Sequence, residues 1–557
     1  MVEHLSLSDA VERHVRPGDA ISIYYGHTRW TAAGREVVRQ FWGRDPGFEL
    51  QWFSMGTLGA MFFSGGLVRK VVTAYSGDGF PTAGPSPIYT KAYRSGQVEV
   101  EHWSGLAMVQ RYEAAARGLP AIVTGSIAGS TMENNPAFHR VETEFGAVGL
   151  LQPLVPDVVL MHAPVADRAG NIALAGPHLE SMWAAWAARR GAIVTVDKIV
   201  DDLSPYGSMV HLPGYRVLSV SEVPFGAHPG GSFARGLPAP SYGEDIPFWI
   251  EARNAVRGDW DGWEREWCLD VPDQDAYLAK IGQQKLDWLS ARSNPESWRD
   301  DEAAHPVDEV SPVSSAEAAA TIAGHELERR IHAIDCDAVL AGAGLSNLSA
   351  WIGAGAARDK GHHVRLAAEV GMYGYIPTPA DPYVFNHRVF PKAEMLADMS
   401  TVLGLIVSGP GTRSIGMLAG AQVDRFGHVN STDIPGTSFI VGAGGGTDVA
   451  CGADECIVVM PARPERTPRD VSYITSPGHT VQSVCTDLGI LRKRDGEMHI
   501  SAVPEGPGTI DERVRTFRSK LGWEAQIDRQ VTEISAPSIA DAVALRRFDP
   551  QRLYLAE

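Results

Sequence analysis

Residues 316–344 read AEAAATIAGHELERRIHAIDCDAVLAGAG. The first part, 316–334, is rich in alanine and places its apolar residues at helical spacing, whereas AVLAGAG at 338–344 is a short apolar run that ends in glycines. Such a run has the length of a buried strand. The pairing of these two kinds of segment recurs where HLESMWAAWAARR (178–190) precedes GAIVTVDKIV (191–200). Further runs of strand length are AISIYYG (20–26) and ECIVVMPA (455–462). This alternation predicts an α/β fold with open, mainly parallel sheets.

Length and local composition predict two large domains. The chain has 557 residues, of which 44% are hydrophobic and 21% charged, as in globular proteins that exceed the size of one core. The segment NPESWRDDEAAHPVDEVSPVSS at 294–315 is polar, acidic and proline-bearing, which is typical of a linker. We therefore expect one domain at 1–293 and a second at 316–557.

The two domains share a local signature that indicates related halves. Asp167-Arg-Ala-Gly170-Asn171 follows one strand-like run, and Asp424-Arg-Phe-Gly427 follows a similar run in the second domain. Each is an Asp-x-x-Gly turn, and turns at comparable places suggest an internal repeat. The tryptophan-rich region 245–292 is expected to be helical and to close the first half, with its aromatic side chains used for packing.

Charge and cysteine content exclude several classes of function. Forty-nine Lys and Arg against 67 Asp and Glu give a net charge of -18, which disfavours nucleic acid and anionic lipid as partners. No segment offers the ~18 uninterrupted apolar residues of a membrane span, and the first twenty residues lack the apolar region of a secretion signal. The five cysteines form no CxxC pair, so we expect reduced thiols and a cytoplasmic location. The histidines at 362, 363 and 387 lack metal-ligand spacing, and no metal is expected.

The segment HVRLAAEVGMYGYIP (363–377) carries the candidate nucleophile. A strand-like run ends in Glu369, and Gly371 and Gly374 follow in a turn. An acid at a strand end before a glycine turn is exposed in a crevice where a bulky substrate can approach the backbone. On spacing alone, Glu369 could equally be a solvated acid at a strand end.

A glycine-rich loop lies further along the second half. Strand-like SFIV at 438–441 opens into Gly442-Ala443-Gly444-Gly445-Gly446-Thr447-Asp448. Consecutive glycines can point several N–H groups at one spot and so hold an oxyanion or a phosphate, although a tight connection explains the loop as well. The loop lacks the GK[ST] of a nucleotide-binding P-loop, and the run at 341–347 lacks the third glycine of a dinucleotide fingerprint.

Three ordered motifs of the second half together resemble the β half of family I CoA-transferases. Ala368-Glu369-Val370-Gly371 with Gly374 resembles the family's Glu-x-Gly-x-x-Gly active-site strand. The segment 422–430 resembles its Gln-Val-Asp/Ser-x-x-Gly-x-x-Asn segment, and the loop 444–448 resembles its Gly-Gly-Ala-x-Asp loop.

The first half resembles the α half of the same family. The likeness lies in Pro17-Gly18-Asp19 before the strand that ends at Gly26, and in the strand at 156–160 that leads to the Asp167–Asn171 turn. Within the family the chain is similar to the glutaconate CoA-transferase branch, through 470–478, Glu101-His-Trp-Ser104 and 114–120. Tyr24-Tyr25-Gly26-His27 departs from the Gly-Gly-Phe-Gly loop that the α half often has.

The resemblance implies two fused halves of the CoA-transferase fold and a transferase that needs no permanently bound cofactor. Coenzyme A, acyl-CoA and a carboxylic acid would be its substrates, and Glu369 would carry CoA as a covalent thioester. With an unperturbed pKa of ~4.3, this carboxyl would be ionised at neutral pH. The other site residues expected in this way are Gly371 and residues 442–446 for the oxyanion or CoA, and Gly26, Glu101, Ser104 and Gln422 for the substrate pocket.

Three alternatives stay open at this point. The chain could be an acyl-CoA hydrolase on the same fold, including one that opens a ring, or a non-catalytic acyl-CoA-binding protein. The acyl group is not identified by the sequence. Self-association into a homo-oligomer also stays open.

Overall fold

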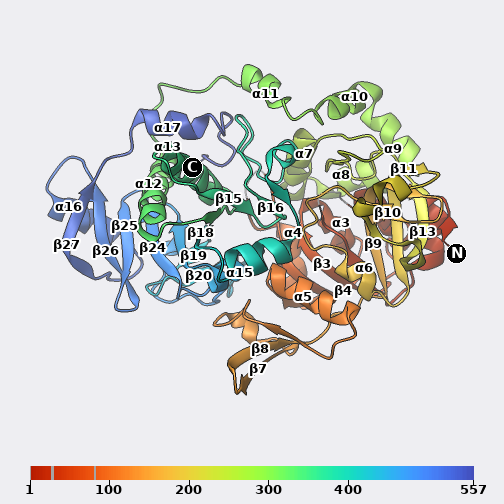
Figure 1. Cartoon of the computed structure of the whole chain (residues 1–557), viewed down its shortest axis with the longest axis horizontal. Helices are drawn as coiled ribbons and strands as arrows, with labels where there is room; N and C mark the ends of the chain where they lie inside the picture. Colours follow the sequence, from red (N-terminus) through yellow and green to blue (C-terminus); the bar gives the residue numbers. More distant parts are fainter. Residues whose placement is uncertain (1, 27–29, 81–82, 557) are drawn as a thin grey trace.

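The computed structural model describes residues 2–26, 30–80 and 83–556, and within them two ten-stranded sheets form the centre of the two halves (Figure 1). Eight strands of the first sheet follow one path in which all neighbours are parallel. In spatial order they are β1 (Glu3–His4), β13 (Val217–Glu222), β11 (Gly191–Val200), β9 (Val158–Asp167), β2 (Ala20–Ile23), β3 (Phe48–Met55), β4 (Val68–Ser76) and β5 (Glu99–His102).

The second sheet has a parallel centre and antiparallel flanks. In spatial order its strands are β17 (Met395–Leu396), β16 (Met372–Tyr373), β15 (Arg365–Ala368), β14 (Ala338–Leu340), β18 (Ser414–Leu418), β23 (Glu455–Val459), β24 (Val481–Thr486), β25 (Gly489–Arg494), β26 (Glu497–Pro504) and β27 (Ile527–Ile534). The α/β class with mainly parallel sheets is thereby confirmed.

The two halves repeat one strand order. β11-β9-β2-β3 in the first sheet corresponds in sequence order and position to β23-β18-β14-β15 in the second. The Asp-x-x-Gly turns also match: Gly170 N–H donates to the Asp167 carbonyl, and Gly427 N–H donates to the Asp424 carbonyl, each at 2.9 Å. Both glycines have positive φ, 81° and 79°, a conformation that side-chain-bearing residues rarely adopt. These features support the related halves expected from sequence.

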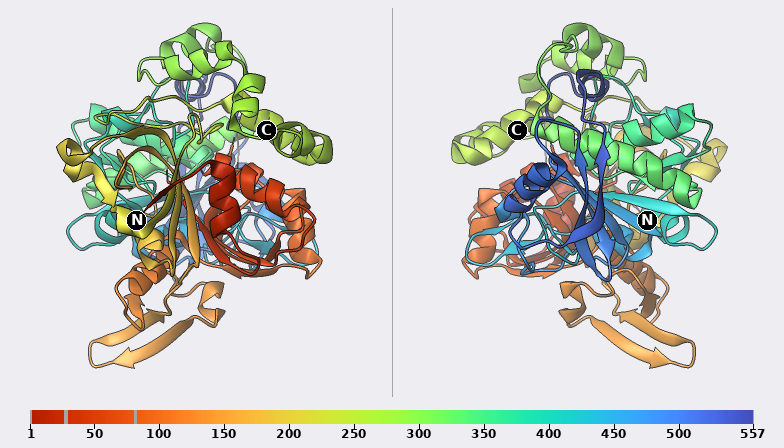
Figure 2. Two further views of the ribbon diagram at one scale, coloured as in Figure 1. Left: turned by 90° about the vertical axis from the view of Figure 1, so that its right-hand side faces the viewer. Right: turned by 90° about the vertical axis from the view of Figure 1, so that its left-hand side faces the viewer.

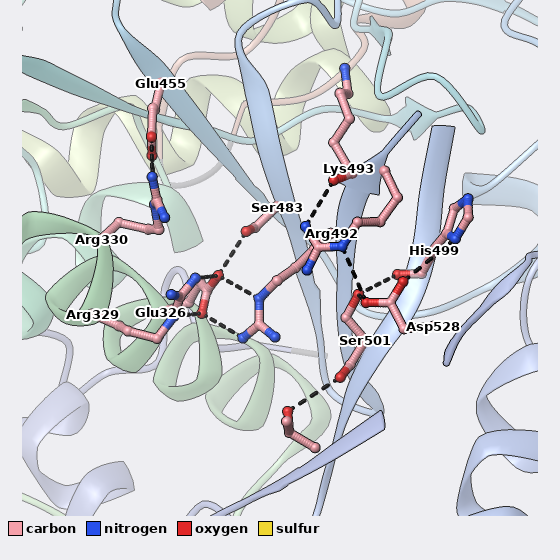
Figure 3. A network of polar contacts seen from close by, with 12 residues as sticks. Glu326, Arg329, Arg330, Glu455, Ser483, Arg492, Lys493, His499, Ser501 and Asp528 are labelled. Carbon is pink, nitrogen blue, oxygen red and sulfur yellow. Dashed lines mark hydrogen bonds and ion pairs between the residues drawn. The ribbon is translucent and has the colours of Figure 1, made fainter. Parts of the chain in front are cut away.

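The helix α12 (Ser315–Ile334) is tied to the second sheet by a buried ionic network (Figure 3). Glu326 on α12 accepts hydrogen bonds from Arg492 on β25 at 3.0 and 2.9 Å and from Ser483 on β24 at 2.8 Å. Burial raises the pKa of Glu326, but hydrogen bonds from Arg329 and Arg492 outweigh burial and lower the pKa to about 2. Because buried charges are stable only when paired, the network fixes α12 against the strands that frame the site described below.

The segment 294–315 is structured and attached to both halves. It contains the helix α11 (Trp298–Ala304), drawn between the halves in Figure 1. Asp301 pairs with Arg292 at 2.9 Å and with Arg388 at 2.7 Å, which joins one residue from each side. The domain limits themselves stay a prediction, whereas the segment is bound to its neighbours through ion pairs.

The two halves share a hydrophobic core. The largest cluster of buried apolar side chains contains members of both, from Tyr24 to Leu555. A small antiparallel sheet of β6 (Ile122–Thr124), β8 (Gly146–Leu151) and β7 (Phe138–Thr143) projects from this body (Figure 2). No helix in the described ranges is long and apolar enough to cross a membrane.

One expected helix is much shorter than its sequence pattern. Of residues 178–190, only Trp183–Ala187 forms a helix, α6. Leu179 and Ser181 have φ values of 41° and 59°, outside the helical range. His178 N–H and Leu179 N–H instead donate to carbonyls of the second half. Tertiary hydrogen bonds thus override the helical spacing in this segment.

Candidate active site

The carboxylate of Glu369 lies directly after the carboxyl end of β15, in the second sheet. Gly371 follows with a φ of 110°, and a Cβ there would lie 2.2 Å from the carbonyl oxygen of Ala397. Only glycine allows this turn and the close approach of the neighbouring backbone. The turn leaves Glu369 half-buried, so that its carboxylate is partly accessible.

Gly445 is the immediate neighbour of the Glu369 carboxylate. A Cβ built on Gly445 would lie 1.9 Å from Oε2 of Glu369, and the Gly445 N–H donates a hydrogen bond to this carboxylate. Gly445 also caps the helix α15 (Gly446–Gly452), whose first turn presents unpaired N–H groups and a partial positive charge. The absence of a side chain at 445 is therefore what allows the contact.

The glycine loop 442–446 rests on the first half of the chain. Gly444 N–H donates to the carbonyl of Ala74 at 2.9 Å, and the Gly444 carbonyl accepts from Gly105 N–H at 2.8 Å. Tyr75 and Gly442 form an isolated antiparallel bridge. Ala74 and Tyr75 belong to β4, and Gly105 begins the helix α5 (Gly105–Ala116). The loop that contacts Glu369 is thus held by the seam between the halves.

A second set of seam contacts lies beside Glu369 itself. Leu179 N–H donates to the carbonyl of Val370 at 2.9 Å, and Met399 N–H donates to the carbonyl of Leu179 at 2.7 Å. The backbone next to Glu369 is therefore bonded to the first half, just as the loop is.

Most N–H groups of the loop are already engaged. Those of Gly442, Gly444 and Gly446 donate to the carbonyls of Ser431, Ala74 and Ala443, at 2.9 Å in each case. Gly445 N–H donates to Glu369, and Ala443 N–H has no partner among the described residues. The sequence suggested that the whole loop offers N–H groups, whereas the structure leaves this capacity to Ala443 and Gly445.

Asp448, in the first turn of α15, completes an acidic pair with Glu369. It is buried and accepts hydrogen bonds from Leu106 N–H at 3.0 Å and from the Ser126 hydroxyl. Burial raises the pKa of Glu369 to about 7, the negative charge of Asp448 adds to this rise, and the Gly445 hydrogen bond opposes it. Burial likewise raises the pKa of Asp448 to about 6. The expectation of an ordinary, fully ionised Glu369 at neutral pH is therefore wrong, because burial was not visible in the sequence.

Of the four residues expected in a substrate pocket, Ser104 is tied to this site. It is the N-cap of α5, and its hydroxyl lies 2.8 Å from that of Ser126, which donates to Asp448. Gly26 follows β2 and is buried against the Tyr24 ring. His27, part of the same motif, lies outside the described residues.

The other two residues have contacts elsewhere. Glu101 on β5 pairs with Lys70 at 3.1 Å and with Arg111 at 2.9 Å. Gln422 donates to the carbonyl of Glu465 and accepts from Asn430, each at 3.1 Å. None of these contacts involves Glu369, so the role of Glu101 and Gln422 in binding substrate stays a prediction.

The described ranges contain no group of three His, Cys, Asp or Glu side chains arranged to hold a metal ion. His387, which the sequence singled out, is buried and hydrogen bonded to the Arg292 carbonyl at 2.6 Å.

Comparison with known proteins shows the family. Residues 4–222 match the family described as Coenzyme A transferase. The chain is 32% identical over 296 residues to one of the two kinds of chain in the 3-oxoadipate CoA-transferase of Pseudomonas knackmussii, covering 51% of this chain and 100% of the relative. The chain belongs to the coenzyme A transferase family.

Further relatives extend this result to both kinds of chain found in such transferases. The other chain of the P. knackmussii enzyme is 26% identical over 205 residues, which cover 33% of this chain and 77% of the relative. One chain of the glutaconate CoA-transferase from Acidaminococcus fermentans is 26% identical over 315 residues, covering 51% and 94%. Matches to both chains of one transferase within a single sequence agree with the fusion of two CoA-transferase halves.

A solved structure supports the fold over nearly the whole chain. The acyl-CoA transferase apoenzyme from Escherichia coli O157:H7 has a TM-score of 0.66 at 15% identity and covers 98% of this chain and 96% of its own. At this identity the likeness shows the CoA-transferase fold.

Sequence reasoning missed the partner of the candidate nucleophile. Asp448 was part of the glycine motif, but its effect on Glu369 depends on packing between segments far apart in sequence. The one local signal was an acid in the first turn after a glycine-rich loop, a position that favours carboxylates at helix starts. Ser126, from the first half, had no signal at all.

Proposed function

We propose that this CoA-transferase moves CoA from an acyl-CoA to a carboxylic acid by a ping-pong mechanism through a glutamyl-CoA thioester on Glu369. The observation that carries the proposal is the contact between the half-buried Glu369 carboxylate and Gly445 N–H at the seam. A nucleophile needs access on one side and a fixed orientation on the other. Glu369 has both.

The first half-reaction transfers CoA to the protein. An oxygen of ionised Glu369 attacks the thioester carbon and expels CoA thiolate, which leaves a mixed anhydride between the acyl group and the Glu369 carboxyl. The thiolate then attacks the glutamyl carbon of this anhydride and releases the first carboxylic acid as its carboxylate. The acceptor carboxylate reverses both steps, forms the new acyl-CoA and restores the Glu369 carboxylate.

Negative charge develops on the carbonyl oxygen in each addition step. The Ala443 N–H is the candidate donor to this oxygen, because it has no other partner in the described part of the loop. Gly445 N–H would hold the Glu369 carboxylate before attack and is the second candidate once that oxygen has bonded to carbon. Fixed N–H donors stabilise such charge because they need no reorganisation.

Dependence on an acceptor separates transfer from hydrolysis. We expect loss of acyl-CoA only when a carboxylic acid is present, with equal amounts of new acyl-CoA formed. Parallel lines in double-reciprocal plots of both substrates would support the ping-pong order. Release of free CoA at the same rate without any acceptor would instead identify a hydrolase, and binding without turnover would identify a non-catalytic protein.

The pH dependence of the first half-reaction should follow Glu369. Only the carboxylate attacks, and burial raises the pKa of Glu369 to about 7, so kcat/KM should rise with pH through a midpoint near 7. Asp448→Asn removes a negative charge next to Glu369, so it should lower the pKa of Glu369 and move the midpoint to lower pH. The measurement is kcat/KM for acyl-CoA between about pH 5 and 9, taken at saturating acceptor.

A surface acid provides the matched control. Asp433 pairs with Arg94 across the seam and is only partly buried. Asp433→Asn makes the same chemical change without a contact to Glu369, so its midpoint should stay near that of the unmodified chain. A midpoint that Asp448→Asn leaves unmoved would contradict the electrostatic pairing of Asp448 with Glu369.

A further inference from the structure

A cavity of about 70 Å³ lies between the halves and is walled by aromatic side chains. Tyr383 comes from the second half, and the other aromatic residues of the lining come from the first. These aromatic residues are Tyr25, Trp30, Phe80, Trp249 and Tyr383. Concave sites with largely apolar walls are where proteins hold small organic groups.

The aromatic walls pack edge to face. The ring centroids of Phe80 and Tyr383 are 5.2 Å apart with an interplanar angle of 79°, and those of Trp249 and Tyr383 are 5.6 Å apart at 76°. This geometry is favourable for aromatic pairs and leaves ring faces and edges for a further ring. The walls therefore suit a flat or compact apolar group.

The described lining contains no ionisable side chain apart from tyrosine hydroxyls. Its two threonine hydroxyls are engaged elsewhere, since Thr57 donates to Asp78 at 2.8 Å and Thr31 donates to the Ala227 carbonyl at 3.1 Å. Asp78 is itself ion-paired with Arg253 and Arg257. A charged group in the cavity would lose its hydration without gaining a charged partner, which is costly.

Tyr25 connects the cavity with the backbone beside Glu369. Its N–H donates to the carboxylate of Glu180, in the turn that also contains Leu179. Leu179 N–H donates to the carbonyl of Val370, the residue after Glu369. The cavity wall is thus joined to the nucleophile by a short series of contacts.

Tyr25 also approaches the glycine loop from its other side. Its ring centroid lies 6.2 Å from that of Phe53, and a Cβ on Gly105 would lie 2.5 Å from Phe53 Cε2. Gly105 is the residue that donates to the carbonyl of Gly444. Tyr25 therefore stands between the aromatic cavity and both elements of the candidate active site.

We propose that this cavity receives the end of the acyl group remote from the thioester, and that this end is an uncharged aromatic or alicyclic ring. The inference rests on the proposed function and adds the substrate class. An acyl group that ends in a second carboxylate is disfavoured, because the described lining offers it no cation. Rejection of a desolvated charge is a stronger discrimination than the gain or loss of one methylene group.

Gly56 allows the cavity to be filled without strain. It lines the cavity, its φ of -77° and ψ of -170° suit any residue, and a Cβ there would meet no described atom within 4 Å. Gly56→Leu should therefore fold and occupy the space meant for the ring. Gly411→Leu is the matched control, since a Cβ on Gly411 also meets no described atom within 4 Å and this residue lies in an exposed loop of the second half.

The first test compares donors with propionate as the acceptor. For the unmodified chain, kcat/KM should be at least about tenfold higher with 3-phenylpropionyl-CoA than with glutaryl-CoA. Gly56→Leu should lower the value for 3-phenylpropionyl-CoA at least about tenfold and leave that for acetyl-CoA within about twofold. Trp249→Ala, at a partly exposed position, should also lower selectively the value for 3-phenylpropionyl-CoA. Gly411→Leu should change none of these values.

The second test does not depend on turnover. Calorimetric titration should show 3-phenylpropionate binding at least about tenfold tighter than glutarate to the unmodified chain, and Gly56→Leu should abolish this difference. Equal binding of the two acids, or ring selectivity unaffected by Gly56→Leu, would overturn the substrate class. If ring-selective binding is found but no acyl-CoA transfers CoA, the cavity assignment stands and the transferase mechanism fails.

Discussion

Glu369→Gln is expected to lower kcat for CoA transfer by at least about 10⁴-fold, the size of loss seen when a nucleophile is removed. Gln keeps the shape of the side chain and can still accept a hydrogen bond from Gly445, but its amide cannot displace a thiolate. The loss should therefore appear in kcat while acyl-CoA still binds. Steady-state kinetics and equilibrium binding of acyl-CoA measure the two separately.

Folding of this variant can be controlled by its stability. Because the pKa of Glu369 is raised on folding from its ordinary value of 4.5 to about 7, ionisation of this group opposes folding above pH 7, and the cost disappears below about pH 4.5. At about pH 8 the Tm of Glu369→Gln should be equal to or above that of the unmodified chain. Glu524→Gln, at an exposed site paired with Arg518, should leave both kcat and Tm unchanged. Transfer by Glu369→Gln within about tenfold of the original rate would refute the covalent role.

Gly445→Ala should have the second largest effect, a loss of about 10²–10³-fold in kcat/KM. The new Cβ would lie 1.9 Å from Oε2 of Glu369, so that either the carboxylate or the loop must move. Either shift removes the alignment between the nucleophile and an N–H donor, and loss of one such donor costs about this factor. The measurement is kcat/KM for acyl-CoA at about pH 8, where Glu369 is mostly ionised.

The adjacent glycine provides a control with the same substitution. A Cβ on Gly446 would lie 3.5 Å from the Ser476 hydroxyl oxygen, which is an ordinary contact, and Gly446 is the first residue of α15. Gly446→Ala should therefore keep kcat/KM within about twofold. Equal losses at 445 and 446 would mean that the loop tolerates no change anywhere, and the specific contact with Glu369 would lose its support.

Regular elements were predictable wherever local pattern and tertiary environment agree. The run GAIVTVDKIV became β11 at Gly191–Val200, and the alanine-rich segment 316–334 became α12. Both have an apolar pattern that matches a sheet or helix buried in its surroundings. The segment 178–190 was mispredicted because seam hydrogen bonds from His178 and Leu179 outweigh helix propensity.

The candidate site was predictable only in part. The position of Glu369 at a strand end and the glycine loop could both be read from sequence, since strands and glycine turns have local signatures. The contact between Glu369 and Gly445, the raised pKa of Glu369 and the use of most loop N–H groups arise from packing across the seam. The aromatic cavity was missed for the same reason: Trp249 was expected only to pack, and its partner Tyr383 comes from the other half.

The covalent glutamyl-CoA thioester is the claim on which the proposed mechanism depends, and chemical trapping tests it directly. The protein is incubated with acyl-CoA in the absence of an acceptor, treated with borohydride, digested and analysed by peptide mass spectrometry. The mechanism predicts reduction of the Glu369 side chain to an alcohol in the peptide that contains it, and no such change in Glu369→Gln. An actively transferring protein whose Glu369 remains unmodified, or whose CoA is carried by another residue, would contradict it.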